Sequence, residues 1–374
     1  MKPLRLVADD LTGALDSGAQ FAGPGRGIPA FFAARLPKAL PEAFAIDGET
    51  REGGVGPASA VAAHLAQFLV GGGGAVSFKK VDSLLRGHPG LELAATLRAI
   101  PVRNCVIAPA FPFQGRVTRG GLQFSRSGGS WSRVGEDLAA VLASKGVAAQ
   151  LRRPGEPVPV GVSLWDAESD GDLRRIAGSG AGLDGPVLWC GSGGLAAALS
   201  GSAPPAIHVA GIERPLLGVF GSDHPVAAAQ LAAFGDVLTM GGPGSAGARD
   251  ATARLERRGV CLVSLETSRG LARPEAARRI ALAIAELTRG VPRPRSVFAA
   301  GGETLRALCL ALGVDHLTVM GQVVPGVPVS RMEGGRWDGV QVISKSGAFG
   351  DEGLLLRIIP GAQSGQNGST PACG

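Results

Sequence analysis

The sequence predicts an α/β fold, with two α/β domains built on mainly parallel sheets and a cleft between the domains. Three observations predict it. Short apolar runs alternate with helix-like patterns, which is typical of βα units. The length of 374 residues exceeds what one hydrophobic core usually serves. A composition of 45% hydrophobic and 18% charged residues supplies enough apolar side chains for two large cores.

The apolar runs mark the expected strands in chain order. They fall at residues 4–8, 75–80, 104–110, 186–190, 216–221, 261–265, 296–301 and 317–321. Helix-like patterns lie at residues 57–69, 134–145, 192–199, 224–234, 246–258, 273–289 and 303–312, and a further helix begins at about Leu11. This alternation favours parallel strands joined by helices.

A domain boundary is expected near residues 200–214, where the stretch SGSAPP interrupts the pattern. We therefore predict one domain over residues 1–210 and another over residues 211–360. The remaining segment, GAQSGQNGSTPACG (361–374), lacks periodicity and is expected to form a flexible tail.

Composition argues against several classes of protein. No apolar stretch reaches the ~18 residues that span a bilayer, and the apolar run at the start is too short for a signal peptide, so we expect a cytoplasmic protein without a membrane partner. The five cysteines lack metal-ligand spacing and are expected to be reduced thiols. The net charge of +6 is spread out without interleaved aromatic residues, which favours small anionic ligands over nucleic acid.

Two aspartates directly follow the first expected strand. Ligands of open α/β sheets bind beyond the carboxyl ends of strands, so Asp9 and Asp10 are candidate site residues. Alternation along the strand predicts that the two carboxylates point in different directions, one capping the next helix and one entering the site. The alternative interpretation, in which both carboxylates only cap the helix and complement its dipole, remains open.

A second polar cluster, FKKVDSLLRGHPG, follows the expected strand at 75–80. Its polar side chains include Lys79, Lys80, Asp82, Ser83, Arg86 and His88. A guanidinium such as Arg86 holds a carboxylate by two parallel hydrogen bonds, and Asp82 could accept a hydroxyl proton. The alternative is a surface ion pair between these two residues.

A third stretch, APAFPFQGRVTRGG, offers Arg116, Thr118 and Arg119 between glycines that let a ligand approach the backbone. Taken alone, it equally fits a Pro/Gly loop with solvated arginines.

Three glycine-containing segments of the second half have features of anion sites: GSDHP (221–225), AGGETL (300–305) and SKSGAFG (344–350). Free backbone N–H groups at a glycine-opened helix start bind anions, and residues 301–304 fit that geometry. Lys345 adds a positive charge. Each segment alone is a common turn, but together they predict a cradle for nucleotide phosphates. No Walker P-loop sequence and no protein-kinase motifs occur.

A competing motif is GSGGLA (191–196), which matches the G-x-G-x-x-A pattern of dinucleotide-binding folds. The helix after it is expected to end by about Ser200, which is short for a Rossmann crossover. The motif is therefore either the NAD site of a dehydrogenase or a place where a helix packs tightly on glycine.

The motifs in their order resemble the four-carbon acid sugar kinase family. ADDLTGALDSG resembles the family's ADDxTGAxD, and KKVDSLLRG resembles its KxDSTLRG. APAFPFQGR, GSGGLA, GGETLRALCLALG, VVPGVP and KSGAFG follow, so the resemblance runs from about residue 5 to residue 358.

The resemblance implies an ATP-dependent kinase that phosphorylates the terminal hydroxyl of a small sugar acid such as threonate, erythronate or an oxo-tetronate. The N-terminal domain would bind the acid and the C-terminal domain ATP with Mg²⁺, with transfer across the cleft. The residues expected to line the acid site are Asp9, Asp10, Lys80, Asp82, Ser83, Arg86 and Arg116. Those expected to hold the nucleotide are Ser222, Gly301, Gly302, Glu303, Thr304, Lys345, Ser346 and Gly347.

The catalytic base is expected among the aspartates of the acid site. Asp82 lies between Lys80 and Arg86, whose charges keep it ionised, so it is favoured as the base or as the group that orients the hydroxyl, with Asp10 second.

The chain also departs from the family pattern in places. The departures are Leu84 for a usual threonine, His88 for a usual asparagine, and Asp223, His224 and Ala227 where small hydroxyl or thiol residues are common. They leave the choice of acid open. A sugar-acid-binding protein without turnover and a dehydrogenase remain as alternative functions, and the oligomeric state is open, a homo-oligomer included.

Overall fold

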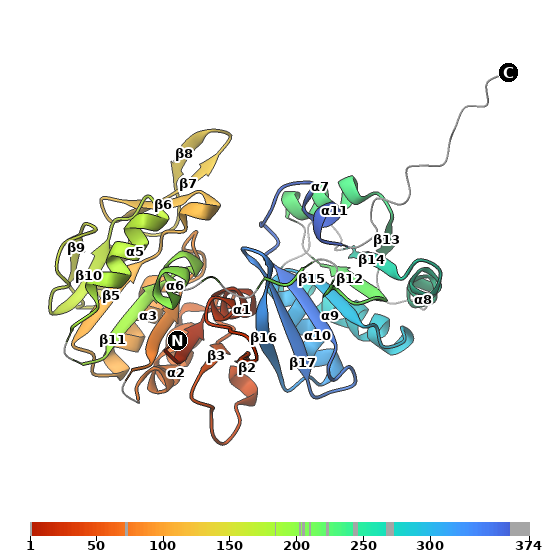
Figure 1. The fold of residues 1–374 in the computed structure, drawn as a ribbon, viewed down its shortest axis with the longest axis horizontal. Helices are drawn as coiled ribbons and strands as arrows, with labels where there is room; N and C mark the ends of the chain where they lie inside the picture. The colour runs from red at the N-terminus through yellow and green to blue at the C-terminus, as the bar shows by residue number, and fades with distance from the viewer. Residues whose placement is uncertain are drawn as a thin grey trace. The chain divides into compact units, whose positions relative to one another are not determined.

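In the computed structural model, the chain forms two compact units, each with a mainly parallel sheet (Figure 1). The structure describes residues 2–71, 74–183, 185–201, 203, 206–208, 211–221, 224–241, 246–266 and 273–359. The first unit comprises Met1–Pro205 and His316–Met320, and the second comprises Ala206–Asp315 and Gly321–Gly374. The α/β fold class with mainly parallel sheets is confirmed, while the domain bounds drawn from the sequence stay a prediction.

The sheet of the first unit reverses its strand order next to β1. Its strands are β1 (Leu4–Ala8), β2 (Ile28–Phe32), β3 (Phe44–Asp47), β4 (Val76–Lys80), β5 (Asn104–Ala108), β9 (Ala149–Arg152), β10 (Gly161–Trp165) and β11 (Val187–Gly191). They lie in the order β2-β3-β1-β4-β11-β5-β10-β9 with parallel neighbours, and part of β16 (His316–Val324) pairs antiparallel with β2. Because β1 lies between β3 and β4, the crevice beyond β1 and β4 is the switch point where such sheets bind ligands.

Helices cover both faces of this first sheet (Figure 1). They are α1 (Leu11–Ala19), α2 (Val55–Ala66), α3 (Pro89–Ala99), α4 (Leu138–Ser144), α5 (Asp170–Ser179) and α6 (Gly193–Ser200). Helix α3 packs between α2 and α4, and α6 packs between α1 and α5. The core between the sheet and α2–α4 is formed by buried side chains such as Ile46, Leu93 and Ile107.

The second unit has the same kind of switch point. Its strands are β12 (Leu216–Phe220), β13 (Val237–Met240), β14 (Val260–Leu265), β15 (Ser296–Ala300), β17 (Val327–Glu333), β18 (Gln341–Lys345) and the rest of β16. The order is β13-β14-β12-β15-β18-β17-β16, parallel from β13 to β18. The helices are α7 (Pro225–Phe234), α8 (Ala246–Arg258), α9 (Arg273–Gly290), α10 (Gly302–Leu312) and α11 (Leu354–Ile358). Strand β12 lies between β14 and β15, so the switch point falls beyond β12 and β15.

The Pro/Gly stretch after β5 folds into a small antiparallel sheet that the sequence did not predict. Its strands are β6 (Arg116–Arg119), β7 (Leu122–Ser127) and β8 (Ser130–Arg133). Two-residue glycine turns with positive φ join them, at residues 120–121 and 128–129. Such turns match the twist of a hairpin, so the glycines close strands instead of leaving a loop.

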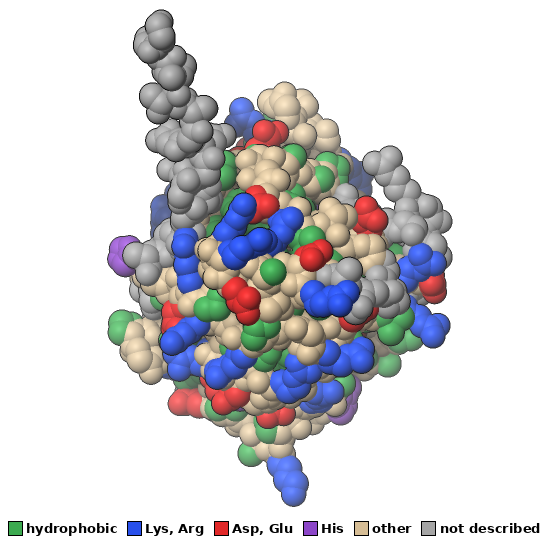
Figure 2. Space-filling view, turned by 90° about the vertical axis from the view of Figure 1, so that its right-hand side faces the viewer, with side chains coloured by type: hydrophobic (Ala, Val, Ile, Leu, Met, Phe, Trp, Pro, Cys, Tyr) green, Lys and Arg blue, Asp and Glu red, His purple; other side chains and the backbone are tan. Residues whose placement is uncertain are grey.

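The described residues also show features of the surface and of the thiols. No helix among the described residues is long and apolar enough to cross a membrane. The cysteines that the structure describes, Cys105, Cys190, Cys261 and Cys309, are buried free thiols. On the face shown in Figure 2, Lys and Arg side chains lie interspersed with Asp and Glu side chains.

Candidate active site

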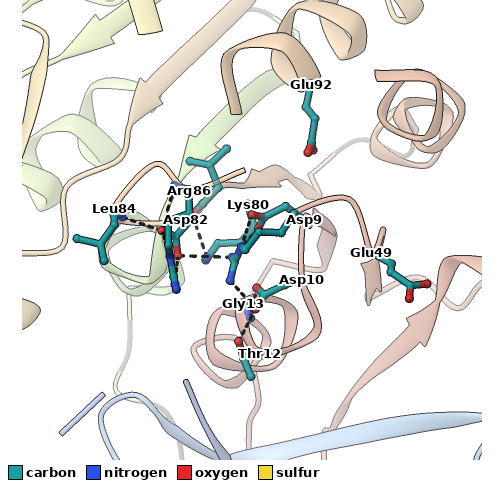
Figure 3. A network of polar contacts seen from close by, with 12 residues as sticks. Asp9, Asp10, Thr12, Gly13, Glu49, Lys80, Asp82, Leu84, Arg86 and Glu92 are labelled. Carbon is teal, nitrogen blue, oxygen red and sulfur yellow. Dashed lines mark hydrogen bonds and ion pairs between the residues drawn. The ribbon is translucent and has the colours of Figure 1, made fainter. Parts of the chain in front are cut away.

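Arg51 joins three carboxylates that come from the ends of β1 and β4. It lies in the loop after β3, and its Nε and Nη2 atoms donate to the two oxygens of Asp9 at 2.7 and 2.9 Å. Its Nη1 lies 2.6 Å from Asp10 Oδ2, and its Nη2 lies 3.6 Å from Asp82 Oδ1. The carboxylates around it converge at the switch point (Figure 3). Side chains from separate loops thus form one charged cluster.

The two aspartates after β1 have different roles. Asp10 caps α1, because its Oδ1 accepts from the backbone N–H of Gly13 at 2.9 Å and its Oδ2 from the hydroxyl of Thr12 at 2.5 Å. Asp9 makes no cap: both of its carboxylate oxygens accept from Arg51, which Asp10 meets through Oδ2 alone. Burial raises the pKa of Asp9. Burial acts in the same direction on Asp10, but the charges of Arg51 and Lys80 outweigh it and lower the pKa of Asp10.

Asp82 is held by Arg86 in a bidentate pair. Nε and Nη2 of Arg86 donate to the two carboxylate oxygens at 2.9 and 2.8 Å, and the backbone N–H of Leu84 adds a third bond at 3.0 Å. Burial opposes ionisation, but these hydrogen bonds and the charge of Arg51 hold the pKa of Asp82 well below its usual range. The Arg86 side chain remains 45% exposed, and its Nη1 is not used in the pair with Asp82.

The loop that carries Asp82 and Arg86 is fixed by its neighbours. Leu85 has φ 55°, an unusual conformation for a bulky residue that marks backbone constrained by its surroundings. A Cβ on Gly87 would lie 3.2 Å from the Cα of Arg51, and His88 Nε2 lies 2.8 Å from the carbonyl oxygen of Gly53. This loop and the one after β3 therefore support each other.

The two lysines of β4 point to opposite faces of the sheet. Lys79 forms a buried ion pair with Glu92 of α3, at 2.6 Å. Lys80 points toward the start of α1, where its ammonium would lie 2.8 Å from a Cβ placed on Gly13, and it donates to the carbonyl of Val81. Only Lys80 is therefore placed to act in the site.

Arg116 at the start of β6 adds another guanidinium. Burial lowers its pKa, while the charge of Asp82 acts in the opposite direction. Its Nε is buried without a hydrogen-bond partner, and its Nη1 donates to the side chain of Gln114. The carbonyl of Ser83 accepts from the side chain of Gln123 at 2.8 Å, which ties the 82–86 loop to β7.

In the second unit, the loops after β12, β15 and β18 meet. A Cβ on Gly221 would lie 2.7 Å from Thr304 Oγ1, and the backbone N–H of Gly301 donates to the carbonyl of Lys345 at 2.9 Å. Gly301 has φ 98° and precedes the first turn of α10, which begins at Gly302. The start of α10 therefore presents backbone N–H groups at the switch point, a geometry that favours an anion.

Lys345 is buried and bound by its own loop. Its ammonium donates to the carbonyl oxygens of Ser346, Gly347 and Phe349, at 3.1 to 3.4 Å. Burial lowers its pKa to about 8. In this structure it shapes the loop from residue 346 to 349, and its predicted contact with a phosphate stays a prediction.

The glycines of GSGGLA pack against the protein itself. A Cβ on Gly191 would lie 2.5 Å from the carbonyl oxygen of Ala108, and one on Gly194 would lie 2.8 Å from that of Ala110. Helix α6 spans only Gly193–Ser200. The motif therefore serves close helix packing, which is the structural alternative that the sequence offered.

Comparison with known proteins gives relatives that match nearly the whole chain. A D-threonate kinase of Cupriavidus necator is 31% identical over 404 residues, which cover 94% of this chain and 95% of that protein. The chain belongs to the four-carbon acid sugar kinase family. A D-threonate kinase of Bordetella bronchiseptica is 29% identical with the same coverage of both chains.

Two parts of the chain also match domain families. Residues 4–153 match a family described as a sugar-binding N-terminal domain, and residues 245–355 match one described as a nucleotide-binding C-terminal domain. A crystal structure from Salmonella typhimurium LT2 has the same fold, with a TM-score of 0.68 at 20% identity, covering 96% of this chain and 98% of that chain.

The structure gathers most of the acid-site residues expected from the family resemblance. Asp9, Asp10, Lys80, Asp82, Arg86 and Arg116 lie around the switch point of the first unit. Sequence reasoning missed Arg51, which follows the short strand β3. Polar residues were sought after expected strands, so Arg51 would have been found if β3, with the sequence FAID, had been recognised as a strand. Ser222 and Asp223 lie outside the described residues.

Two of the family departures have visible side-chain contacts. His88 Nε2 lies 2.8 Å from the carbonyl oxygen of Gly53. His224 is the N-cap of α7, where its Nδ1 accepts from the backbone N–H of Val226 at 3.2 Å.

Proposed function

We propose that this chain is an ATP-dependent kinase that transfers a phosphoryl group to the terminal hydroxyl of a four-carbon sugar acid, with D-threonate as the first acid to test. The observation that carries the proposal is the cluster of Asp9, Asp10 and Asp82 around Arg51 at the switch point. It occurs in a chain whose full-length relatives are named D-threonate kinase. Kinase action on four-carbon sugar acids follows from that kinship.

The first predicted domain, residues 1–210, would bind the acid. Arg86 offers accessible N–H groups, and Lys80 and Arg116 add positive charge on the same side. These groups match a carboxylate, which favours a guanidinium fork. Asp82 would fix the orientation of Arg86 and of a substrate hydroxyl.

The second predicted domain, residues 211–360, would bind ATP at the start of α10. Backbone N–H groups from 301 to 304 and the 345–347 loop would surround the phosphates. Mg²⁺ is usually held by one or two carboxylates and substrate phosphates. Glu303, in the first turn of α10, belongs to the same predicted nucleotide site. An ATP-dependent metabolic kinase fits the predicted cytoplasmic location, and the oligomeric state stays open.

The other two functions are less well supported. The dehydrogenase would need space for a pyrophosphate at GSGGLA, but Gly191 and Gly194 lie against the chain's own carbonyls. A binding protein without turnover is less well supported because the curated relatives are named as kinases.

A thermal-shift panel with ATP-Mg, NAD and four-carbon acids, followed by a coupled assay for ADP, tests the proposal. Selective ligands raise the apparent stability of the folded state, so ATP-Mg and one acid should raise the Tm and NAD should not. ADP release should depend on that acid. A shift with NAD, or a shift with the acid but no ADP release, would favour one of the other functions.

A further inference from the structure

Asp16 of the first unit takes part in none of the arginine–carboxylate pairs described above. It lies on α1, less than two turns after Asp10. Its Oδ1 is buried and has no hydrogen-bond partner among the described residues. Both oxygens of Asp9 and Asp82 accept from arginines, and those of Asp10 accept from the start of α1. Asp16 is thus a carboxylate of this region with an unsatisfied acceptor.

The position of Asp16 depends on a glycine of the GSGGLA motif. A Cβ on Gly193 would lie 2.5 Å from Asp16 Oδ2 and 2.9 Å from the ring of Phe111. Because Gly193 has no side chain, the carboxylate fits against the first turn of α6. This contact gives GSGGLA a part in the site that does not involve a dinucleotide.

The charged groups that act on Asp16 belong to the acid site. The Lys80 ammonium lies beside Gly13, three residues before Asp16 on α1, and Asp10 lies at the start of the same helix. The segments packed against it from α6 and the loop after β5, GGLAAALS and APAF, carry no charged side chain. Burial raises the pKa of Asp16 to about 6, opposed by Lys80 and reinforced by Asp10. A general base works best when its pKa is near the working pH.

We propose that the Asp16 carboxylate is the acceptor of the proton that leaves the substrate hydroxyl. This rests on the proposed kinase function. The hydroxyl O–H bond breaks, its proton passes to Asp16, and the oxygen forms a bond to the γ-phosphorus of the nucleoside triphosphate. The bond from that phosphorus to the bridging oxygen breaks, and its electron pair leaves with the nucleoside diphosphate.

This assignment differs from the one favoured by the sequence. Asp82 would have to give up charge-assisted bonds from Arg86 to accept a proton, and Asp10 would have to release the start of α1. Both are suited to orient groups. Asp16 can accept a proton without breaking any bond that its Oδ1 makes in this structure.

The test compares Asp16→Asn with Asp137→Asn as a matched control. Asp137 caps α4, and asparagine caps a helix about as well, so the control should keep the wild-type kcat. Asp16→Asn should lower kcat by about a hundredfold or more with a small change in KM for the acid. It should also remove the decline of kcat below about pH 6 that the wild type is expected to show. A near-normal kcat, or an unchanged acidic limb, would overturn the proposal.

Two further measurements separate catalysis from folding. Added formate should raise the kcat of Asp16→Ala about tenfold or more over its value without formate. A small carboxylate can replace the missing base but cannot repair a misfolded site. In protein labelled at the aspartate carboxyl carbons, a signal that titrates near pH 6 should vanish in Asp16→Asn. No rescue and no such signal would reject the role of Asp16.

The outcomes also separate this role from the kinase function. A wild type inactive with every acid would reject the kinase function and this role together, whereas an active wild type beside an equally active Asp16→Asn would reject this role alone.

Discussion

The guanidinium of Arg51 and the carboxylate of Asp9 form two parallel hydrogen bonds although the residues are 42 positions apart in the chain. The pair joins the loop after β3 to the end of β1. Since Asp10 and Asp82 also lie beside Arg51, its removal would leave buried carboxylates without their shared partner.

Replacing Arg51 should therefore destabilise the fold. Removing one partner of a buried ion pair typically costs about 3–5 kcal/mol, so Arg51→Met should lower the free energy of unfolding by that order. Arg98 of α3 is exposed, and Arg98→Met should change stability by no more than about 0.5 kcal/mol. Urea unfolding of the two variants measures the difference. Equal stabilities would show that Arg51 does not hold the cluster together.

Asp82→Asn should impair catalysis without affecting ATP binding. The amide cannot bind Arg86 in the same charge-assisted way, so the turnover number should fall by about a hundredfold, while the acidic limb of the pH profile remains. Calorimetry with ATP and steady-state kinetics test both parts. Should Asp82→Asn keep near-normal turnover while Asp10→Asn abolishes it, Asp10 would take the role given to Asp82.

The same variant has a pH-dependent effect on stability. The folded-state pKa of Asp82 is depressed, so its pairing stabilises the fold above the unfolded-state pKa of about 3.9 and loses this effect as the pH falls further. The stability gap between wild type and Asp82→Asn should therefore be full at pH 7 and shrink below about pH 4. A gap that grows on acidification would contradict the assignment.

Arg86→Lys should weaken binding of the acid specifically. Lysine keeps the charge but loses the planar fork, so the KM for the acid should rise while that for ATP changes little. An equal rise in both constants would mean that Arg86 acts on the fold rather than on the acid's carboxylate.

Gly302→Val should block ATP binding. The side chain would fill the space where a phosphate approaches the first turn of α10, whereas Gly178 of α5 has open space around it and Gly178→Val serves as the control. Isothermal titration of the full chain with ATP compares them. Wild-type affinity in Gly302→Val would remove the start of α10 from the nucleotide site.

The sequence predicted the parts of the fold that have strong local signals. Fully buried strands such as β5 and β15 read as continuous apolar runs, and several helices were placed within a few residues. Strand β3 has only four residues and was missed, and with it Arg51. Helices α3 and α5 were also missed. The glycines around β6–β8 suggested a loop because sequence alone does not reveal that their φ angles close hairpins.

The same limit applies to the site. Strand-end reasoning found Asp10, Asp82 and Lys80, because parallel strands bring their carboxyl ends together. It could not show which carboxylate would be satisfied by arginine and which would be left with a free acceptor. That distinction depends on contacts between distant segments, such as Asp16 against Gly193.

The most direct test of the central claim is ³¹P nuclear magnetic resonance of the products formed by the purified chain from ATP-Mg and D-threonate. We expect ADP together with a new phosphomonoester signal coupled to the protons of the acid's terminal carbon, in equal amounts. ATP left unchanged, or converted only to ADP and inorganic phosphate, with D-threonate and with each other four-carbon acid, would contradict it.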